Sequence, residues 1–136
     1  METSKLSLDM RTKVMQESLV NYGSTSLSDI QLECIKYDQA ILSLSLSKPT
    51  EKITLSFEWI YSLRVTDEGD LLKMLDYFNG KMTTGVYKVE NSSYLEWFHE
   101  QSENIHDEVI EHYLIVTIDE VIEVLASVEP SIEIIN

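Results

Sequence analysis

The sequence predicts an α+β fold, in which an antiparallel sheet of about five to seven strands carries two or three helices. Two observations support this prediction. Several segments alternate apolar and polar residues with a period of two, which is typical of strands with one solvated face. Other segments repeat apolar residues at three- and four-residue steps, which is typical of amphipathic helices. With 136 residues, the chain is long enough for a single domain with a buried core.

The chain divides into an N-terminal helix and loop over residues 1–26 and a sheet with helices over residues 27–136. Met10, Val14, Met15 and Leu19 follow one another at near-helical spacing. This spacing predicts a short amphipathic helix over roughly residues 9–20. The polar tract after it predicts a loop that leads into the sheet.

The next segments indicate strands, because apolar residues alternate with polar ones. Leucines at positions 42, 44 and 46 alternate with three serines, and a similar alternation runs from Ile53 through Trp59 toward Val65. An earlier alternation includes Cys34. We therefore expect three antiparallel strands joined as a meander, with Cys34 and Trp59 facing the core.

Two further helices are indicated by apolar spacing and by their end residues. The acids at 67–70 precede apolar residues at helical spacing, and Asn79-Gly80 follows them; acids suit a helix N-terminus. After a strand at 85–89, residues 91–93 are suited to capping a second helix over 94–101.

The C-terminal region is predicted to hold a buried central strand at 112–117, because this run is continuously apolar. Residues 118–127 are ambiguous. Thr117 and Glu120 could form a capping box that begins a helix, or Asp119-Glu120 could turn a hairpin. The β-branched composition slightly favours the hairpin. A short last strand at 132–135 follows Pro130.

The charge is strongly negative and unevenly distributed. The net charge is −14, and residues 67–136 hold 16 acids and 3 bases. This balance argues against a non-specific nucleic-acid binder and against an anionic membrane surface. Two interpretations are equally open: an acidic surface that attracts a basic protein partner electrostatically, and a solvated face that only keeps the protein monomeric. The absence of an apolar leader or spanning run predicts a cytoplasmic protein.

No motif indicates an enzymatic reaction or a cofactor. His99, His106 and His112 lie close in sequence, but their spacing matches no metal motif. Cys34 has acidic neighbours rather than the electropositive setting of a reactive thiol. We therefore expect no catalytic residue, no metal and no cofactor.

Acidic residues without basic neighbours are the candidate partner-binding site. The main band consists of Glu100, Glu103, Asp107, Glu108 and Glu111. Its members recur at three- and four-residue steps, so that one helix would line them along one side; a solvated loop is the alternative. Asp67, Glu68 and Asp70 form a possible second patch, and Trp97 is a candidate aromatic anchor.

Residues 91–130 contain phrases, at 91–102, 112–117, 122–125 and 129–130, that resemble small bacterial immunity-type proteins of toxin–immunity systems. The resemblance implies a cytoplasmic inhibitor that neutralises a basic toxin domain, such as a nuclease domain, by direct complexation. It supplies no catalytic residue. An intracellular adaptor or regulatory protein with the same acidic face is the alternative, and an enzyme is the least favoured reading.

Overall fold

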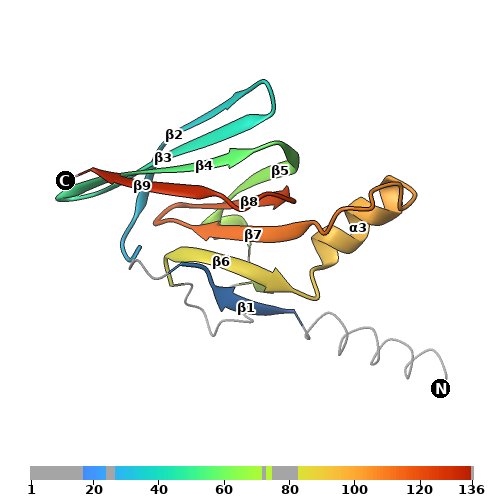
Figure 1. Cartoon of the computed structure of the whole chain (residues 1–136). Helices are drawn as coiled ribbons and strands as arrows, with labels where there is room; N and C mark the ends of the chain where they lie inside the picture. The colour runs from blue at the N-terminus through green and yellow to red at the C-terminus, as the bar shows by residue number, and fades with distance from the viewer. Residues whose placement is uncertain (1–16, 24–26, 72, 75–82, 136) are drawn as a thin grey trace, which may run out of the picture.

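The computed structural model describes residues 17–23, 27–71, 73–74 and 83–135. Within these residues the chain forms nine strands in two antiparallel sheets, one of five strands and one of four (Figure 1). A single α-helix is defined within the same residues. The fold is therefore mostly β. The predicted α+β fold, with about five to seven strands and two or three helices, is wrong.

The two sheets differ in which parts of the chain they use. The five-stranded sheet has the order β1-β6-β7-β8-β5, and the four-stranded sheet has the order β2-β3-β4-β9. The first sheet consists of β1 (Ser18–Asn21), β6 (Gly85–Glu90), β7 (Glu111–Val116), β8 (Glu120–Ala126) and β5 (Ile60–Asp67). The second consists of β2 (Gln31–Asp38), β3 (Ile41–Lys48), β4 (Glu51–Glu58) and β9 (Ser131–Ile135).

The predicted meander is confirmed as strands β2, β3 and β4, which pair in sequence. The continuation toward Val65 differs from the prediction, because the chain leaves the four-stranded sheet at Trp59 and enters the other sheet as β5. Trp59 has a φ of 60°, and its N–H donates to the carbonyl of Ala40 at 2.8 Å. This left-handed residue redirects the chain, so the Trp59 side chain is 64% exposed rather than in the core.

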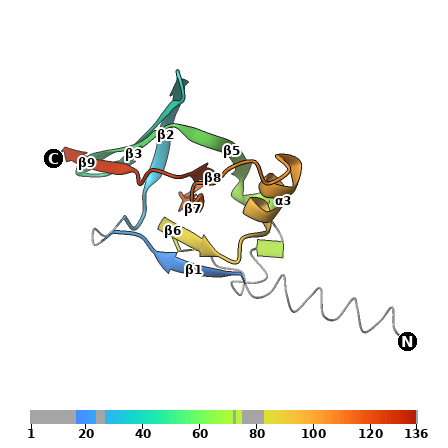
Figure 2. The ribbon, with the colours of Figure 1, turned by 45° about the vertical axis from the view of Figure 1, so that its right-hand side comes forward.

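The main core lies between the two sheets, whose strands are labelled in Figure 2. The leucines of β3 face inward, and its serines lie on the opposite face, as the period of two predicts. Tyr113 of β7 lies at the centre and contacts Phe57 and Tyr22 edge-on. The fully buried aliphatic residues of this core include Leu42, Leu44, Ile53, Leu55, Ile115, Ile122 and Val124.

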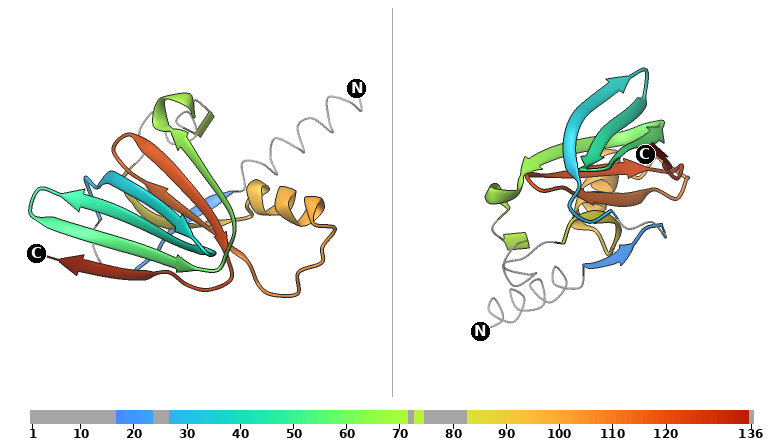
Figure 3. Two further views of the ribbon diagram at one scale, coloured as in Figure 1. Left: turned by 90° about the horizontal axis from the view of Figure 1, so that it is seen from above. Right: turned by 90° about the vertical axis from the view of Figure 1, so that its left-hand side faces the viewer.

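Helix α3 (Ser93–Gln101) covers the outer face of the five-stranded sheet. The helix was expected at 94–101, and it begins there because Oγ of Ser92 accepts the N–H of Leu95 at 3.0 Å. Tyr94 is buried against Leu125 of β8. Figure 3 shows α3 and the loop after it at the end of the sheet where β4 turns into β5.

The ambiguous segment after residue 117 is a hairpin, so β7 and β8 pair directly. The two residues of the alternative capping box form the turn instead: Thr117 Oγ1 donates to the Glu120 carbonyl at 2.8 Å and accepts the Glu120 N–H at 3.0 Å. The strands predicted at 85–89, 112–117 and 132–135 are also confirmed.

Two of the helix predictions fall partly outside the described residues. Most of the expected N-terminal helix, including Met10, Val14 and Met15, lies outside the described residues, and its last residues form strand β1. Most of the helix expected after the acids at 67–70 also lies outside the described residues. The acids themselves form a 3-10 turn, η1 (Glu68–Asp70), whose N-cap residue Asp67 accepts the N–H of Gly69 at 2.8 Å.

Cys34 is exposed, which contradicts the expected core position. The register of β2 against β3 shifts by one residue between Leu32 and Cys34. A bulge of this kind moves every later side chain to the opposite face. Ile35 therefore faces the core and Cys34 faces outward on the edge of the sheet.

Candidate functional site

The acidic band does not lie on one helix, so this part of the prediction is wrong. Helix α3 ends at Gln101 and is followed by two residues with positive φ, Glu103 at 52° and Asn104 at 55°. These left-handed residues stop the helix, because continuing it requires negative φ. Of the predicted band, Glu100 lies on α3 and Glu111 begins β7. The other three members, Glu103, Asp107 and Glu108, lie between these two elements.

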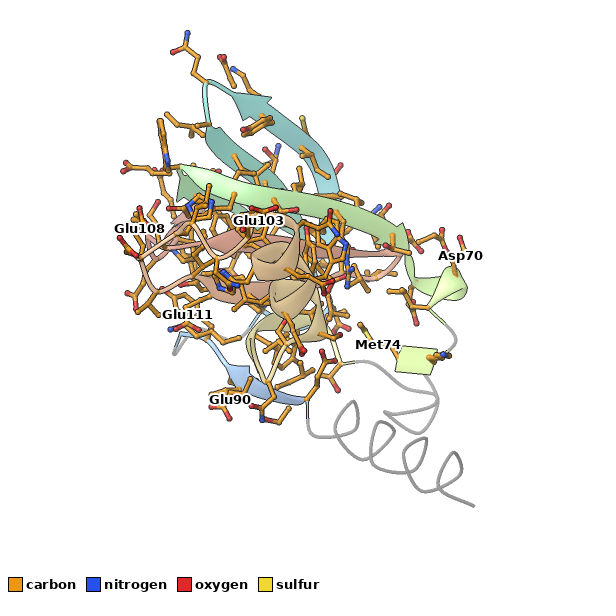
Figure 4. The ribbon with its side chains drawn as sticks, turned by 90° about the vertical axis from the view of Figure 1, so that its right-hand side faces the viewer. Asp70, Met74, Glu90, Glu103, Glu108 and Glu111 are labelled. Atoms are coloured by element: carbon orange, nitrogen blue, oxygen red, sulfur yellow. The ribbon has the colours of Figure 1, made fainter. Side chains whose placement is uncertain are left out.

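The structure nevertheless gathers part of this band. Glu108 and Glu111 lie at one side of the molecule in Figure 4, Glu103 lies nearer the middle, and Asp70 lies at the other side. The eight residues of β5 separate the two regions, which corresponds to about 23 Å of extended strand. The second patch of Asp67, Glu68 and Asp70 is therefore distinct from the main band.

We call residues 102–110 the acidic loop. Its backbone is held by bonds from the Asn104 N–H to the His99 carbonyl at 2.9 Å and from the Ile105 N–H to the Ser102 carbonyl at 3.2 Å. The His106 ring stacks on Phe98 with centroids 5.5 Å apart. Backbone bonds and the stacked ring together give the loop a defined shape without secondary structure.

The acidic loop exposes two aliphatic side chains between its acids. Ile105 is 71% exposed and Val109 is 76% exposed. His106, between them, faces inward instead, and its Nδ1 lies 4.0 Å from the Glu108 carboxylate. An apolar group surrounded by charged groups is the usual anatomy of a protein-binding surface.

The corner between the sheets, residues 58–61, lies beside the acidic loop. Ile60 and Glu111 both pair with Ala126, from opposite sides, so their backbones are about 10 Å apart. A register shift follows Ile60, and the Tyr61 ring contacts His106 with centroids 4.9 Å apart. The exposed residues Glu58 and Trp59 are therefore held next to the loop.

Beneath α3 lies a network of charged and polar side chains, in which Glu123 and His112 are buried and Arg64 is half exposed. Glu123 is 1% exposed, and Arg64 of β5 contacts both of its carboxylate oxygens, at 2.6 and 2.9 Å. Nε2 of His112 lies 2.8 Å from the same carboxylate, at ion-pair distance but without the alignment of a hydrogen bond. The other ring nitrogen, Nδ1, lies 2.6 Å from Oγ of Ser92.

Further contacts join this network to the helix and to the chain before β1. The Arg64 guanidinium lies over the Tyr94 ring, 3.9 Å from its centroid. The Tyr94 hydroxyl bonds to Ser62, and the Ser93 N–H donates to the Glu17 carboxylate. The network therefore connects α3 with β5, β7 and β8.

A serine, a histidine and a glutamate in series are also the groups of a nucleophilic triad. Here Oγ of Ser92 already accepts an amide proton of its own helix, and the residue is 8% exposed. An acyl substrate would need free access to that oxygen. We therefore interpret the network as the attachment of α3 to the sheet.

The remaining candidate residues are dispersed. His112 is buried in the network, His106 stacks in the acidic loop and His99 lies on α3. Among the described residues, no group of three or more His, Cys, Asp or Glu side chains is placed to hold a metal ion. In the same part of the chain, no helix is long and apolar enough to cross a membrane. Trp97 is 51% exposed, and its ring stacks on Tyr94.

Sequence reasoning missed the buried network, although the sequence carries a signal for it. Glu123 interrupts the apolar run of the buried strand β8, and β5 carries a single cation, Arg64. A charge inside a buried strand requires a partner. Pairing these two strands would have identified the ion pair.

Comparisons with protein-family models, with curated proteins and with solved structures find no match to this chain.

Proposed function

We propose that this protein is an acidic protein-binding module that engages a basic partner through the acidic loop. The observation that carries the proposal is the loop's construction. His106 fixes the loop on Phe98 and Tyr61, while Ile105 and Val109 project to solvent. A loop that is ordered before binding loses little conformational entropy when it binds.

The electrostatics support a basic partner. Within the described residues, no Lys or Arg forms an ion pair with the loop acids or with Glu111. Like charges held close together repel one another, and a partner's Lys and Arg side chains would relieve that repulsion. Attraction of this kind raises the association rate and weakens as salt is added.

The narrower proposal is an immunity-type inhibitor in the cytoplasm that covers the basic surface of a toxin domain, such as a nuclease. The net charge of −14 is complementary to a nuclease surface, which is basic because it must bind the phosphates of its substrate. The alternative is an intracellular adaptor or regulatory protein that uses the same loop. Identifying the partner, by capture on the purified protein and mass spectrometry, distinguishes the two.

Charge reversal tests the proposed interface with that purified partner. The triple variant Glu103→Lys, Asp107→Lys and Glu108→Lys changes three exposed side chains. It should fold normally and bind at least tenfold more weakly, which corresponds to about 1.4 kcal/mol. The matched control reverses three exposed acids outside both candidate patches, Asp119, Glu129 and Glu133. Equal effects of the two variants would show that net charge, and not the loop, governs binding.

A further inference from the structure

Trp59 occupies a position that its own fold does not explain. Its φ of 60° is in the left-handed region, which residues with a Cβ atom rarely adopt and which Gly and Asn adopt readily. Its indole is 64% exposed. The change of direction between β4 and β5 needs the backbone conformation, not the aromatic side chain. The chain therefore places a large aromatic ring in solvent at a site where a smaller residue would make the same turn.

Acidic residues lie near Trp59 along the chain and across the sheet. Glu58 precedes it and is exposed, and Glu111 lies across β8 from its neighbour Ile60. The acidic loop continues from Glu111 with Glu108 and Asp107. An aromatic face beside carboxylates is a favourable site for a cation, and Arg is the cation that most often stacks on such rings.

The molecule uses the same combination internally. The Arg64 guanidinium lies over the Tyr94 ring, 3.9 Å from its centroid, and donates two parallel hydrogen bonds to the two carboxylate oxygens of Glu123. One aromatic face and one carboxylate thus hold a guanidinium from two sides. Trp59 and the neighbouring Glu58 are both exposed, so the same two kinds of group are available to a partner.

We propose that Trp59 and the acidic loop together receive an arginine-bearing segment of the partner, with one Arg side chain stacked over the indole and its guanidinium directed toward the carboxylates. This inference rests on the proposed function and adds to it the centre of the interface and the type of residue recognised. The aliphatic part of the same Arg packs on apolar surface while its charge stays near the acids. Ile105 and Val109 extend that apolar surface along the loop.

A library of random 12-residue peptides displayed on phage tests the proposal without a known partner. Selection on the wild-type protein should enrich peptides that carry a net positive charge and at least one Arg. The best peptide is then synthesised with each Arg replaced in turn by citrulline, which keeps the shape and removes the charge. We expect one citrulline peptide to bind at least tenfold more weakly, by calorimetry.

Protein variants then locate the arginine. Trp59→Asn, which suits the left-handed backbone, should bind the selected peptide at least tenfold more weakly. Trp59→Phe keeps an aromatic face and should retain most of the binding. Trp97→Asn tests the other candidate anchor; because the exposed Trp97 ring already stacks on Tyr94, this variant should bind within about twofold of wild type if Trp59 alone receives the Arg.

The possible failures are distinguishable. Selected peptides without positive charge would overturn the proposed function and this inference together. Arg-containing peptides that bind Trp59→Asn as well as wild type would overturn the inference and leave the basic partner standing. Equal binding of all citrulline peptides would also overturn the inference, because no single guanidinium charge would then be recognised.

Discussion

Oγ of Ser92 lies 2.6 Å from Nδ1 of His112, so the residue that caps helix α3 is bonded directly to a buried strand. The same oxygen accepts the Leu95 N–H. The other ring nitrogen of His112 lies 2.8 Å from the Glu123 carboxylate. The start of helix α3 is therefore joined through one imidazole ring to the buried Glu123.

Removing Glu123 should destabilise the protein. Glu123→Leu leaves Arg64 and His112 without their shared carboxylate; because the Arg64 side chain is half exposed and keeps access to water, we expect a loss of about 1–3 kcal/mol, below the roughly 3–5 kcal/mol of a fully buried pair. Urea unfolding followed by circular dichroism measures this loss. The control Glu133→Leu, at an exposed position of β9, should change the unfolding free energy by less than about 0.5 kcal/mol. Similar losses in the two variants would contradict the role of the network.

The stability should also depend on pH through Glu123. Burial raises the pKa of this carboxyl, but its contacts with His112 and Arg64 outweigh burial, so the pKa lies below its ordinary value of 4.5. A carboxyl of this kind stabilises the folded state above its unfolded pKa, and this stabilisation is lost as the pH falls through the folded pKa.

We therefore expect the wild type to be more stable than Glu123→Gln at neutral pH, and the difference to shrink as the pH falls below about 4.5. Unfolding in urea at a series of pH values compares the two proteins. A difference that is constant over the whole range would mean that the ionised carboxylate contributes nothing.

His106 should hold the acidic loop in shape. His106→Ala removes contacts with Phe98 and Tyr61, each of a kind worth about 0.5–1.5 kcal/mol. Amide hydrogen exchange of residues 102–110 should accelerate by about fivefold, while strands β7 and β8 keep their protection. His99→Ala is the control on the preceding helix. Faster exchange throughout the molecule would indicate a general loss of stability instead.

Cys34 should react with a maleimide in the native protein. The bulge in β2 places it on the outer face, exposed at the sheet edge. Mass spectrometry should show complete labelling under native conditions at a rate similar to that in denaturant. Labelling that requires unfolding would mean that β2 lacks the bulge and that Cys34 faces the core.

The sequence predicted the regular parts of the fold, because periodicity reports which face of a strand is buried. Leu42 and Leu44 are buried and Ser43 lies on the other face, as expected. The helix at 93–101 was predictable because Ser92 carries the capping oxygen at its start. The hairpin after Thr117 was favoured by composition and is present.

The errors arise where one residue changes the direction or register of the chain. Trp59 and Cys34 both fit an alternating pattern, but the pattern does not report the sign of φ or a bulge. The acids of the loop fit a helical repeat, which ignores the left-handed residues at Glu103 and Asn104. The candidate site lies at these irregular positions, so periodicity alone could not locate it.

The contact between Arg64 and Glu123 joins residues 59 positions apart, and this separation has a consequence for synthesis. Strand β5 leaves the ribosome before its partner β8 exists, and at about 5–20 residues per second the delay is roughly 3–12 s. The meander β2-β3-β4 can form meanwhile, because its contacts are local. The nascent chain therefore carries an unpaired strand with an unneutralised arginine for seconds, which is the interval in which a chaperone would bind it.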